Sequence, residues 1–136
     1  RHSLNATLTM GTPGDFIASV IARFGSGLPY TPSLVNQRTG LENSDNRPAI
    51  LSVDLYGTKE FELDGLVLSV FVKVYNLFDT ANELNVFGDT GRAGYTLELT
   101  RAQEAPRGAN TLAQYYTRPD FYSAPRQVVV GASVGF

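Results

Sequence analysis

The stretch LVLSVFVKVYNLF, residues 66–78, decides the fold class because its aliphatic side chains repeat with a period of two. Ser69 and Lys73 fall on the alternate positions, opposite the aliphatic series. Side chains of a strand point alternately to its two faces, whereas those of a helix repeat about every 3.6 residues. The stretch therefore predicts a strand with one apolar face, formed by Leu66, Leu68, Val70, Val72 and Val74.

The same alternation recurs in both directions from this stretch. It predicts five long strands, at about 2–10, 16–25, 49–60, 66–78 and 126–136. Short turns are expected at GTPGD (11–15) and at Asp64-Gly65, because Gly, Pro and Asp favour tight turns. The intervening segments 25–48 and 79–124 are long and rich in turn formers, and GYTLELT (94–100) is expected to form a short hairpin arm.

Strand length and loop asymmetry favour a membrane setting over an aqueous one. Roughly 9–11 residues are needed for a tilted strand to cross the hydrocarbon core, and strands of soluble sheets average about five or six. Outer-membrane barrels also join their strands by short turns at one end and long loops at the other. The sequence thus predicts an all-β, antiparallel transmembrane β-barrel segment with two long extracellular loops. Its lipid-facing residues would be Leu66, Leu68, Val70, Val72, Val74, Val128 and Val130.

Five strands are an odd number, and two apolar strand edges left unpaired in lipid would be costly. We therefore expect residues 1–136 to be the closing part of a larger barrel, with earlier strands absent. On the opposite face Arg23, Asp54 and Lys73 would form a polar interior lining. The alternative is a soluble β-sandwich that binds a ligand or carbohydrate, with Val70, Val72, Val74, Val128 and Val130 buried against one another. A small independent barrel is disfavoured by the odd strand count.

Composition argues against several functional classes. A net charge of −2 and a pI near 5.3 give no support to nucleic-acid binding. With no cysteine and one histidine, the chain offers no thiolate site, no histidine metal cluster and no Ser-His-Asp triad. GTPG and GDTG lack the strand-to-helix setting and following lysine of a phosphate loop. Asp79, Asn82, Asp89 and Arg92 are better explained by turns and a loop salt bridge than by a metal site. We expect no catalytic residue, metal or cofactor.

Two longer stretches resemble the C-terminal end of TonB-dependent outer-membrane receptors. They are NLFDTANELNVFGDTGRAGYTLE (76–98) and RPDFYSAPRQVVVGASVGF (118–136). The upstream stretches SGLPYTP (26–32) and RPAILSVDLYGTKEF (47–61) are similar to the preceding strands of those barrels. The resemblance implies an outer-membrane location, a barrel of roughly 22 strands with a plugged lumen, and nutrient uptake energised by TonB through an N-terminal region that is missing here.

The resemblance also implies roles for individual residues. Gly131, Val134 and Phe136 match a terminal signal read by the outer-membrane barrel assembly machinery, although Val129 stands where a polar residue is usual. Strand addition at an exposed edge explains such recognition physically. In the extracellular loops the candidates for contact with an unknown small-molecule, glycan or peptide ligand are Tyr30, Arg92, Tyr115 and Tyr116. For Tyr115 and Tyr116, packing within the loop or at the membrane interface is the expected role.

Overall fold

The computed structural model describes residues 2–98 and 111–136, and most of its regular secondary structure is antiparallel β. The chain separates into two compact units, here called the sheet unit and the loop unit. The sheet unit comprises Ser3–Phe24, Leu51–Thr80 and Ala124–Phe136. The loop unit contains His2, Gly25–Ile50 and the described part of Ala81–Ser123.

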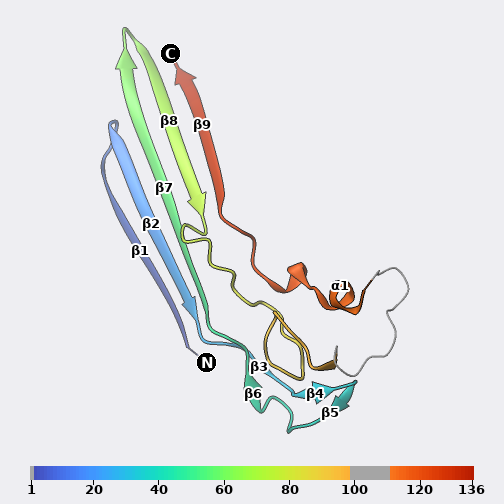
Figure 1. Cartoon of the computed structure of the whole chain (residues 1–136). Coiled ribbons are helices and arrows are strands. Elements are labelled where there is room, and N and C mark those ends of the chain that lie inside the picture. Colours follow the sequence, from blue (N-terminus) through green and yellow to red (C-terminus); the bar gives the residue numbers. More distant parts are fainter. Residues whose placement is uncertain (1, 99–110) are drawn as a thin grey trace. The chain divides into compact units, whose positions relative to one another are not determined.

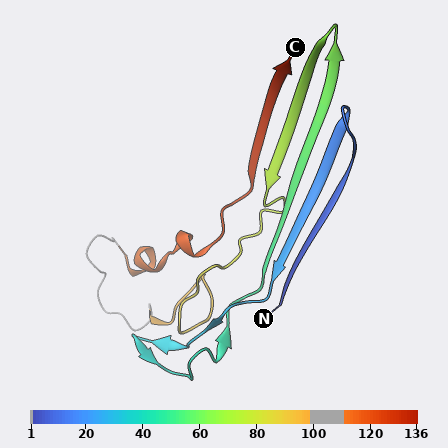
Figure 2. The same cartoon turned by 180° about the vertical axis from the view of Figure 1, so that it is seen from behind.

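The sheet unit is a single antiparallel sheet of five long strands, which lie side by side in both views of Figures 1 and 2. In spatial order the strands are β1 (Ser3–Thr12), β2 (Phe16–Gly25), β7 (Ile50–Leu63), β8 (Leu66–Tyr75) and β9 (Gln127–Gly135). All five sequence-predicted strands are therefore present, with ends that differ by a few residues. The sheet of the described residues is open, with β1 and β9 as its edges.

The turn between β7 and β8 sets the register of the central pair. Asp64 and Gly65 both have positive φ values, 47° and 86°, between the paired residues Leu63 and Leu66. Two central residues with positive φ define the tight hairpin whose twist matches that of the strands. The predicted Asp64-Gly65 turn is confirmed.

The register places the predicted aliphatic residues on one face of the sheet. Directly paired residues of antiparallel strands lie on the same face. Val72 pairs with Val130 and Val74 pairs with Val128, and the other members of the series follow by alternation. We call this side the apolar face. On β7, Leu55, Gly57, Lys59, Phe61 and Leu63 pair with β8 residues of the same face.

Hydrogen-bonding side chains gather on the opposite side, here called the polar face. Ser69 pairs with Ser133 across β8 and β9. The Thr9 and Ser19 hydroxyls lie 2.9 Å apart between β1 and β2. Arg23 on β2 donates to the Asp54 carboxylate on β7 at 2.5 Å. The sheet is therefore two-sided across all five strands.

The sheet unit contains a single layer, without a second sheet or helix packed on either face among its described residues. The one buried hydrophobic residue among them is Ala93, which belongs to the loop unit. Val128 and Val130 are 59% and 68% exposed. The mutual burial of valines expected for a β-sandwich is not observed.

The loop unit contains short strands and helices that the hydrophobic periodicity of the sequence did not predict. Two-residue strands form the ribbons β3 (Pro29–Tyr30) with β6 (Asp45–Asn46), and β4 (Ser33–Leu34) with β5 (Gln37–Arg38). Further along are the helix α1 (Leu112–Tyr116) and a 3-10 turn at Pro119–Phe121. None of the helices within residues 2–98 and 111–136 has the length and apolar character needed to cross a membrane.

The expected hairpin arm at GYTLELT is wrong for the residues described, 94–98, none of which is in a strand. The Asp89 carboxylate accepts hydrogen bonds from the Thr96 hydroxyl at 2.9 Å and the Leu97 amide at 2.5 Å. The Thr96 hydroxyl in turn accepts from the Glu98 amide at 3.1 Å. Side chains thus take the backbone donors that a partner strand would have used.

Candidate functional site

The NLFD stretch, Asn76–Asp79, forms a polar clasp at the end of β8. Asn76 is buried and has a φ of 52°. Its Nδ2 donates to the carbonyls of Thr80 at 3.1 Å and Ala124 at 3.0 Å, and its Oδ1 accepts from the Thr80 amide at 2.9 Å. Asparagine tolerates the left-handed conformation better than most residues. The residue therefore satisfies three backbone groups from one strained position.

Asp79 extends the clasp to the last strand. Its φ is 53°, and its Oδ1 accepts from the Arg126 amide at 2.7 Å, one residue before β9. The Asn76 amide donates to Asp54 on β7 at 3.0 Å. The clasp thus connects β7, the end of β8 and the start of β9. The alternation predicted that the strand continues to residue 78, whereas β8 ends at Tyr75 and Asn76–Asp79 forms the clasp instead.

The predicted assembly signal lies on β9, an edge strand of the sheet. Val134 is 60% exposed and pairs with Leu68 on the apolar face, while Phe136 beyond the strand is fully exposed. Gly131 lies on the polar face opposite Phe71. The Phe71 ring occupies the position where a side chain at 131 would begin, since a Cβ built there would lie 2.5 Å from Phe71 Cε1 and Cζ. A glycine at this position makes room for an aromatic ring across the strand pair.

Three charged residues of the polar face, Arg23, Asp54 and Lys73, are paired or lie over aromatic rings. The Lys73 ammonium is 5.2 Å from the Phe71 ring centroid and 5.7 Å from that of Tyr56. Such cation–π contacts stabilise a charge without a carboxylate partner. Arg23 and Asp54 form the ion pair described above. These residues lie on the polar side of the sheet that the alternation predicts.

In the loop unit, Arg92 and Glu83 form a bidentate ion pair. Arg92 Nη2 and Nε donate to Glu83 Oε1 at 2.7 and 3.0 Å, and the Ala93 amide donates to Oε2 at 2.6 Å. The Glu83 side chain is 10% exposed. The Arg92 hydrogen bonds, together with that of Ala93, outweigh burial and hold the pKa of Glu83 below its ordinary value. Arg92, a predicted ligand contact, is therefore engaged in the loop's own structure.

Tyr30 holds the two loops of this unit together. Gly91 has a φ of 67°, and a Cβ there would lie 3.1 Å from Tyr30 Cζ. Nearby, the Ser33 amide donates to the Gly88 carbonyl at 2.9 Å. Burial, followed by the neighbouring Asp45 carboxylate, raises the pKa of the Tyr30 hydroxyl. The second predicted ligand contact thus packs against a loop backbone.

Arg47 adds a further connection between these loops. Its Nη1 donates to the Leu84 carbonyl at 2.5 Å and to Asn85 Oδ1 at 3.0 Å. Val35 contributes as well, since its amide donates to Glu98 Oε1 at 2.8 Å. The segments 25–48 and 81–98 therefore form one hydrogen-bonded body.

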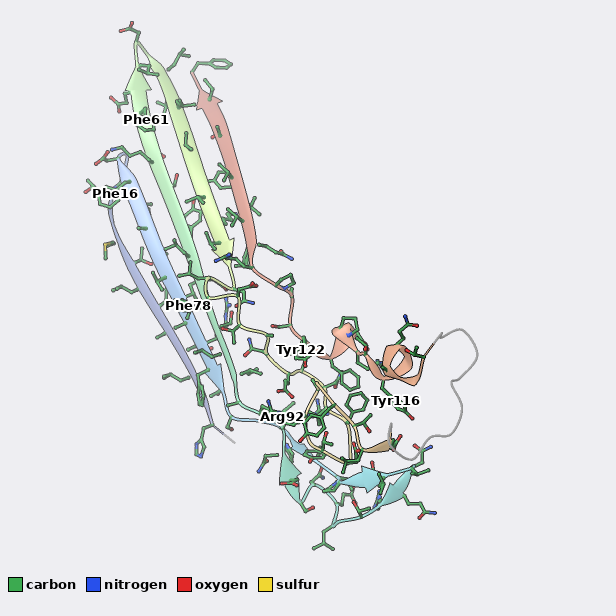
Figure 3. All side chains as sticks on the ribbon, viewed as in Figure 1. Phe16, Phe61, Phe78, Arg92, Tyr116 and Tyr122 are labelled. Carbon is green, nitrogen blue, oxygen red and sulfur yellow. The ribbon has the colours of Figure 1, made fainter. Side chains whose placement is uncertain are left out.

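Aromatic side chains surround an open hollow of about 450 Å³ in the same unit. Phe87 contacts Phe121 and Tyr116 with ring centroids 5.1 and 6.3 Å apart. The hollow is lined by Tyr95, Tyr116 and Tyr122 among others, and Figure 3 shows Tyr116 and Tyr122 on the segment that carries α1. Tyrosines offer a stacking surface and a hydroxyl, which suits a ligand that is partly apolar and partly polar.

Of the three predicted ligand contacts whose side chains are described, Tyr30, Arg92 and Tyr116, the structure brings Tyr116 to this hollow. The side chain of Tyr115 lies outside the described part of the chain. Tyr95 was not identified from the sequence, because a single aromatic within GYTLELT can equally line a ligand-sized hollow or pack against its own loop. Arg118 also lines the hollow, and it is paired with Asp120 at 2.6 Å and lies 4.5 Å from the Phe121 centroid.

The acidic residues considered for a metal serve as hydrogen-bond acceptors in separate turns. Asp79 belongs to the clasp, and Asp89 binds Thr96 and Leu97. Within residues 2–98 and 111–136, no three His, Cys, Asp or Glu side chains gather in a way that could hold a metal ion.

The chain matches no protein-family model, no curated protein and no solved structure.

Proposed function

We propose that residues 1–136 are the C-terminal barrel segment of a TonB-dependent outer-membrane receptor. The observation that carries the proposal is the two-sided sheet: one face is apolar, apart from Lys59, across five long strands, and no hydrophobic residue of these strands is buried within the described residues. In an aqueous domain such a face needs a second layer, whereas lipid itself covers it in an outer membrane. The segment would supply barrel closure and substrate-facing loops, and the proposal includes no catalytic step.

Three further features support this proposal. Tight turns join β1 to β2 and β7 to β8, whereas long segments follow β2 and β8. Strand lengths of 9 to 14 residues suit a tilted crossing of the hydrocarbon core. The resemblance of NLFD and of the terminal stretch to these receptors adds the specific family. Its partners would be outer-membrane lipid, the barrel assembly machinery, TonB through an upstream region, and a small-molecule, glycan or peptide ligand.

Single-cysteine labelling tests the membrane setting directly, because residues 1–136 contain no cysteine, and any cysteine elsewhere in the polypeptide is first replaced by serine. Two variants, Val70→Cys and Ala132→Cys, probe a directly paired position on the apolar face. Two others, Ser69→Cys and Ser133→Cys, probe the neighbouring pair on the polar face. The variants are made in the complete natural polypeptide and expressed to the outer membrane. Fluorescent labels at 70 and 132 should be quenched by brominated lipid, whereas labels at 69 and 133 should not.

Equal access of a water-soluble thiol reagent to all four positions would contradict the proposal. A chain that remains monomeric in detergent-free buffer and unfolds cooperatively would favour the soluble binding module instead. Ligand classes can then be compared by measuring uptake into cells with and without TonB.

A further inference from the structure

Lys59 is a charged residue on an otherwise uncharged apolar face. It pairs directly with Val70 and stands between Gly57 and Phe61 on that side of β7. No other residue assigned to this face on the described strands is charged. A lone ammonium in contact with hydrocarbon is costly, so such a residue needs a partner.

The partner is Asp15, in the turn between β1 and β2. The Lys59 ammonium forms an ion pair with the Asp15 carboxylate. The Asp15 carbonyl also accepts from the Glu60 amide at 2.7 Å, which attaches the turn to β7. Both side chains remain about half exposed, 45% for Lys59 and 50% for Asp15. The pair therefore offers a positive and a negative group side by side, with hydrogen-bonding capacity left on each.

An apolar hollow of about 550 Å³ lies beside this ion pair. Gly57 leaves space in its wall, and Lys59 itself lines it. The other lining residues are largely apolar and include Phe16, Ala18, Phe61, Val72 and Val130. Figure 3 shows Phe16 and Phe61 toward the same end of the sheet, the end that carries the two tight turns.

We propose that this hollow binds one phospholipid with an ethanolamine headgroup, an inference that rests on the proposed membrane function. The phosphate diester lies against the Lys59 ammonium, the lipid ammonium against the Asp15 carboxylate, and an acyl chain in the hollow. The charges are complementary, because the headgroup places an anionic phosphate beside the Lys59 cation and an ammonium beside the Asp15 anion. A choline headgroup has no N–H to donate to Asp15, and a headgroup without an ammonium offers Asp15 no cation beyond Lys59.

The test measures which lipids remain bound to the complete natural polypeptide after extraction from bilayers that contain equal amounts of phosphatidylethanolamine and phosphatidylcholine. Native mass spectrometry should give an ethanolamine-to-choline ratio of about threefold to tenfold, as befits two partly exposed charge contacts. In the double variant Lys59→Gln with Asp15→Asn the ratio should fall to that of the bulk. Gly57→Leu, which fills the hollow, should lower retention of both lipids. Lys73→Gln removes a lysine from the polar face and should leave the ratio unchanged.

A wild-type ratio equal to that of the bilayer overturns the inference, as does an unchanged ratio in the double variant. Should that variant fail to fold, mono- and dimethylated ethanolamine lipids offered to the wild type provide the same comparison, because each methyl group removes one donor. The labels at positions 70 and 132 separate this inference from the proposed function. Lipid contact at those positions without headgroup preference refutes only the ethanolamine site, whereas absence of lipid contact refutes the membrane proposal itself.

Discussion

The ring of Phe71 on β8 occupies the space that a side chain at Gly131 on β9 would need. The two residues pair directly, and a Cβ at 131 would approach the Phe71 ring to 2.5 Å at two of its carbons. Real Cβ atoms do not come this close, so either the ring or the strand must shift when a side chain is added. A glycine at position 131 thus leaves room for the Phe71 ring across the strand pair, as in the aromatic covering of strand glycines.

Replacement of Gly131 by alanine should therefore destabilise the β8–β9 pair by about 1–3 kcal/mol, the usual cost of overpacking. Gly135→Ala is the matched control, since a Cβ there would meet its nearest neighbour, the Val67 carbonyl, at 3.9 Å. Urea unfolding in detergent micelles measures both. The double variant Gly131→Ala with Phe71→Ala should lose less stability than the sum of the losses in the two single variants, because without the ring the added Cβ no longer clashes. Equal stabilities of the two alanine variants would remove this explanation.

The Asn76 side chain is expected to be essential for the clasp. Asn76→Ala removes three hydrogen bonds to backbone groups and should cost about 1–3 kcal/mol. Asn76→Gly separates the loss of the hydrogen bonds from the cost of placing alanine at a positive φ, because glycine adopts that φ without strain. Hydrogen exchange of the Thr80 and Arg126 amides should accelerate in both variants. Unchanged protection of Thr80 in Asn76→Gly would show that the side chain is dispensable.

The Glu83–Arg92 pair predicts that the loop unit loosens in acid. The folded-state pKa of Glu83 lies below its ordinary value of 4.5, so this carboxylate stabilises the folded loop above that pH. The contribution is lost as the pH falls from about 4.5 through the depressed folded pKa. The protection factor of the Ala93 amide, which donates to Glu83, should fall over this window once the intrinsic pH dependence of exchange is corrected for. Glu83→Gln should abolish the pH dependence, and a wild-type profile in that variant would assign it to another group.

Removal of Phe136 should affect assembly rather than stability. The residue is fully exposed and lies beyond β9, so its deletion should change the free energy of unfolding by less than about 0.5 kcal/mol. If the side chain is read by the assembly machinery, the amount of folded protein in the outer membrane should nevertheless fall. Ser133→Ala, on the same strand, is the control. Normal abundance without Phe136 would refute the assembly signal.

Several features of the fold could be predicted from the sequence because they depend on neighbours along the chain. Alternation in LVLSVFVKVYNLF fixes which residues share a face, and Asp64-Gly65 has the residues that positive φ angles require. The local period is a property of the strand itself, whatever covers it. The two short ribbons and the course of 94–98 could not be predicted in this way. Two-residue strands have no period, and Asp89 takes the backbone donors of a segment that otherwise alternates.

The sequence by itself therefore determined that the chain is built of long two-sided strands, and which side of each is aliphatic. Only the tertiary structure decided what the polar residues of the loops do. It placed Arg92 on Glu83, Tyr30 against Gly91, and Tyr95 with Tyr116 around one hollow. It also paired Lys59 with Asp15, 44 positions earlier in the chain. Alternation is a relation between neighbouring residues of one strand. These pairings instead depend on which separate segments meet in the folded chain, and a local pattern does not determine that.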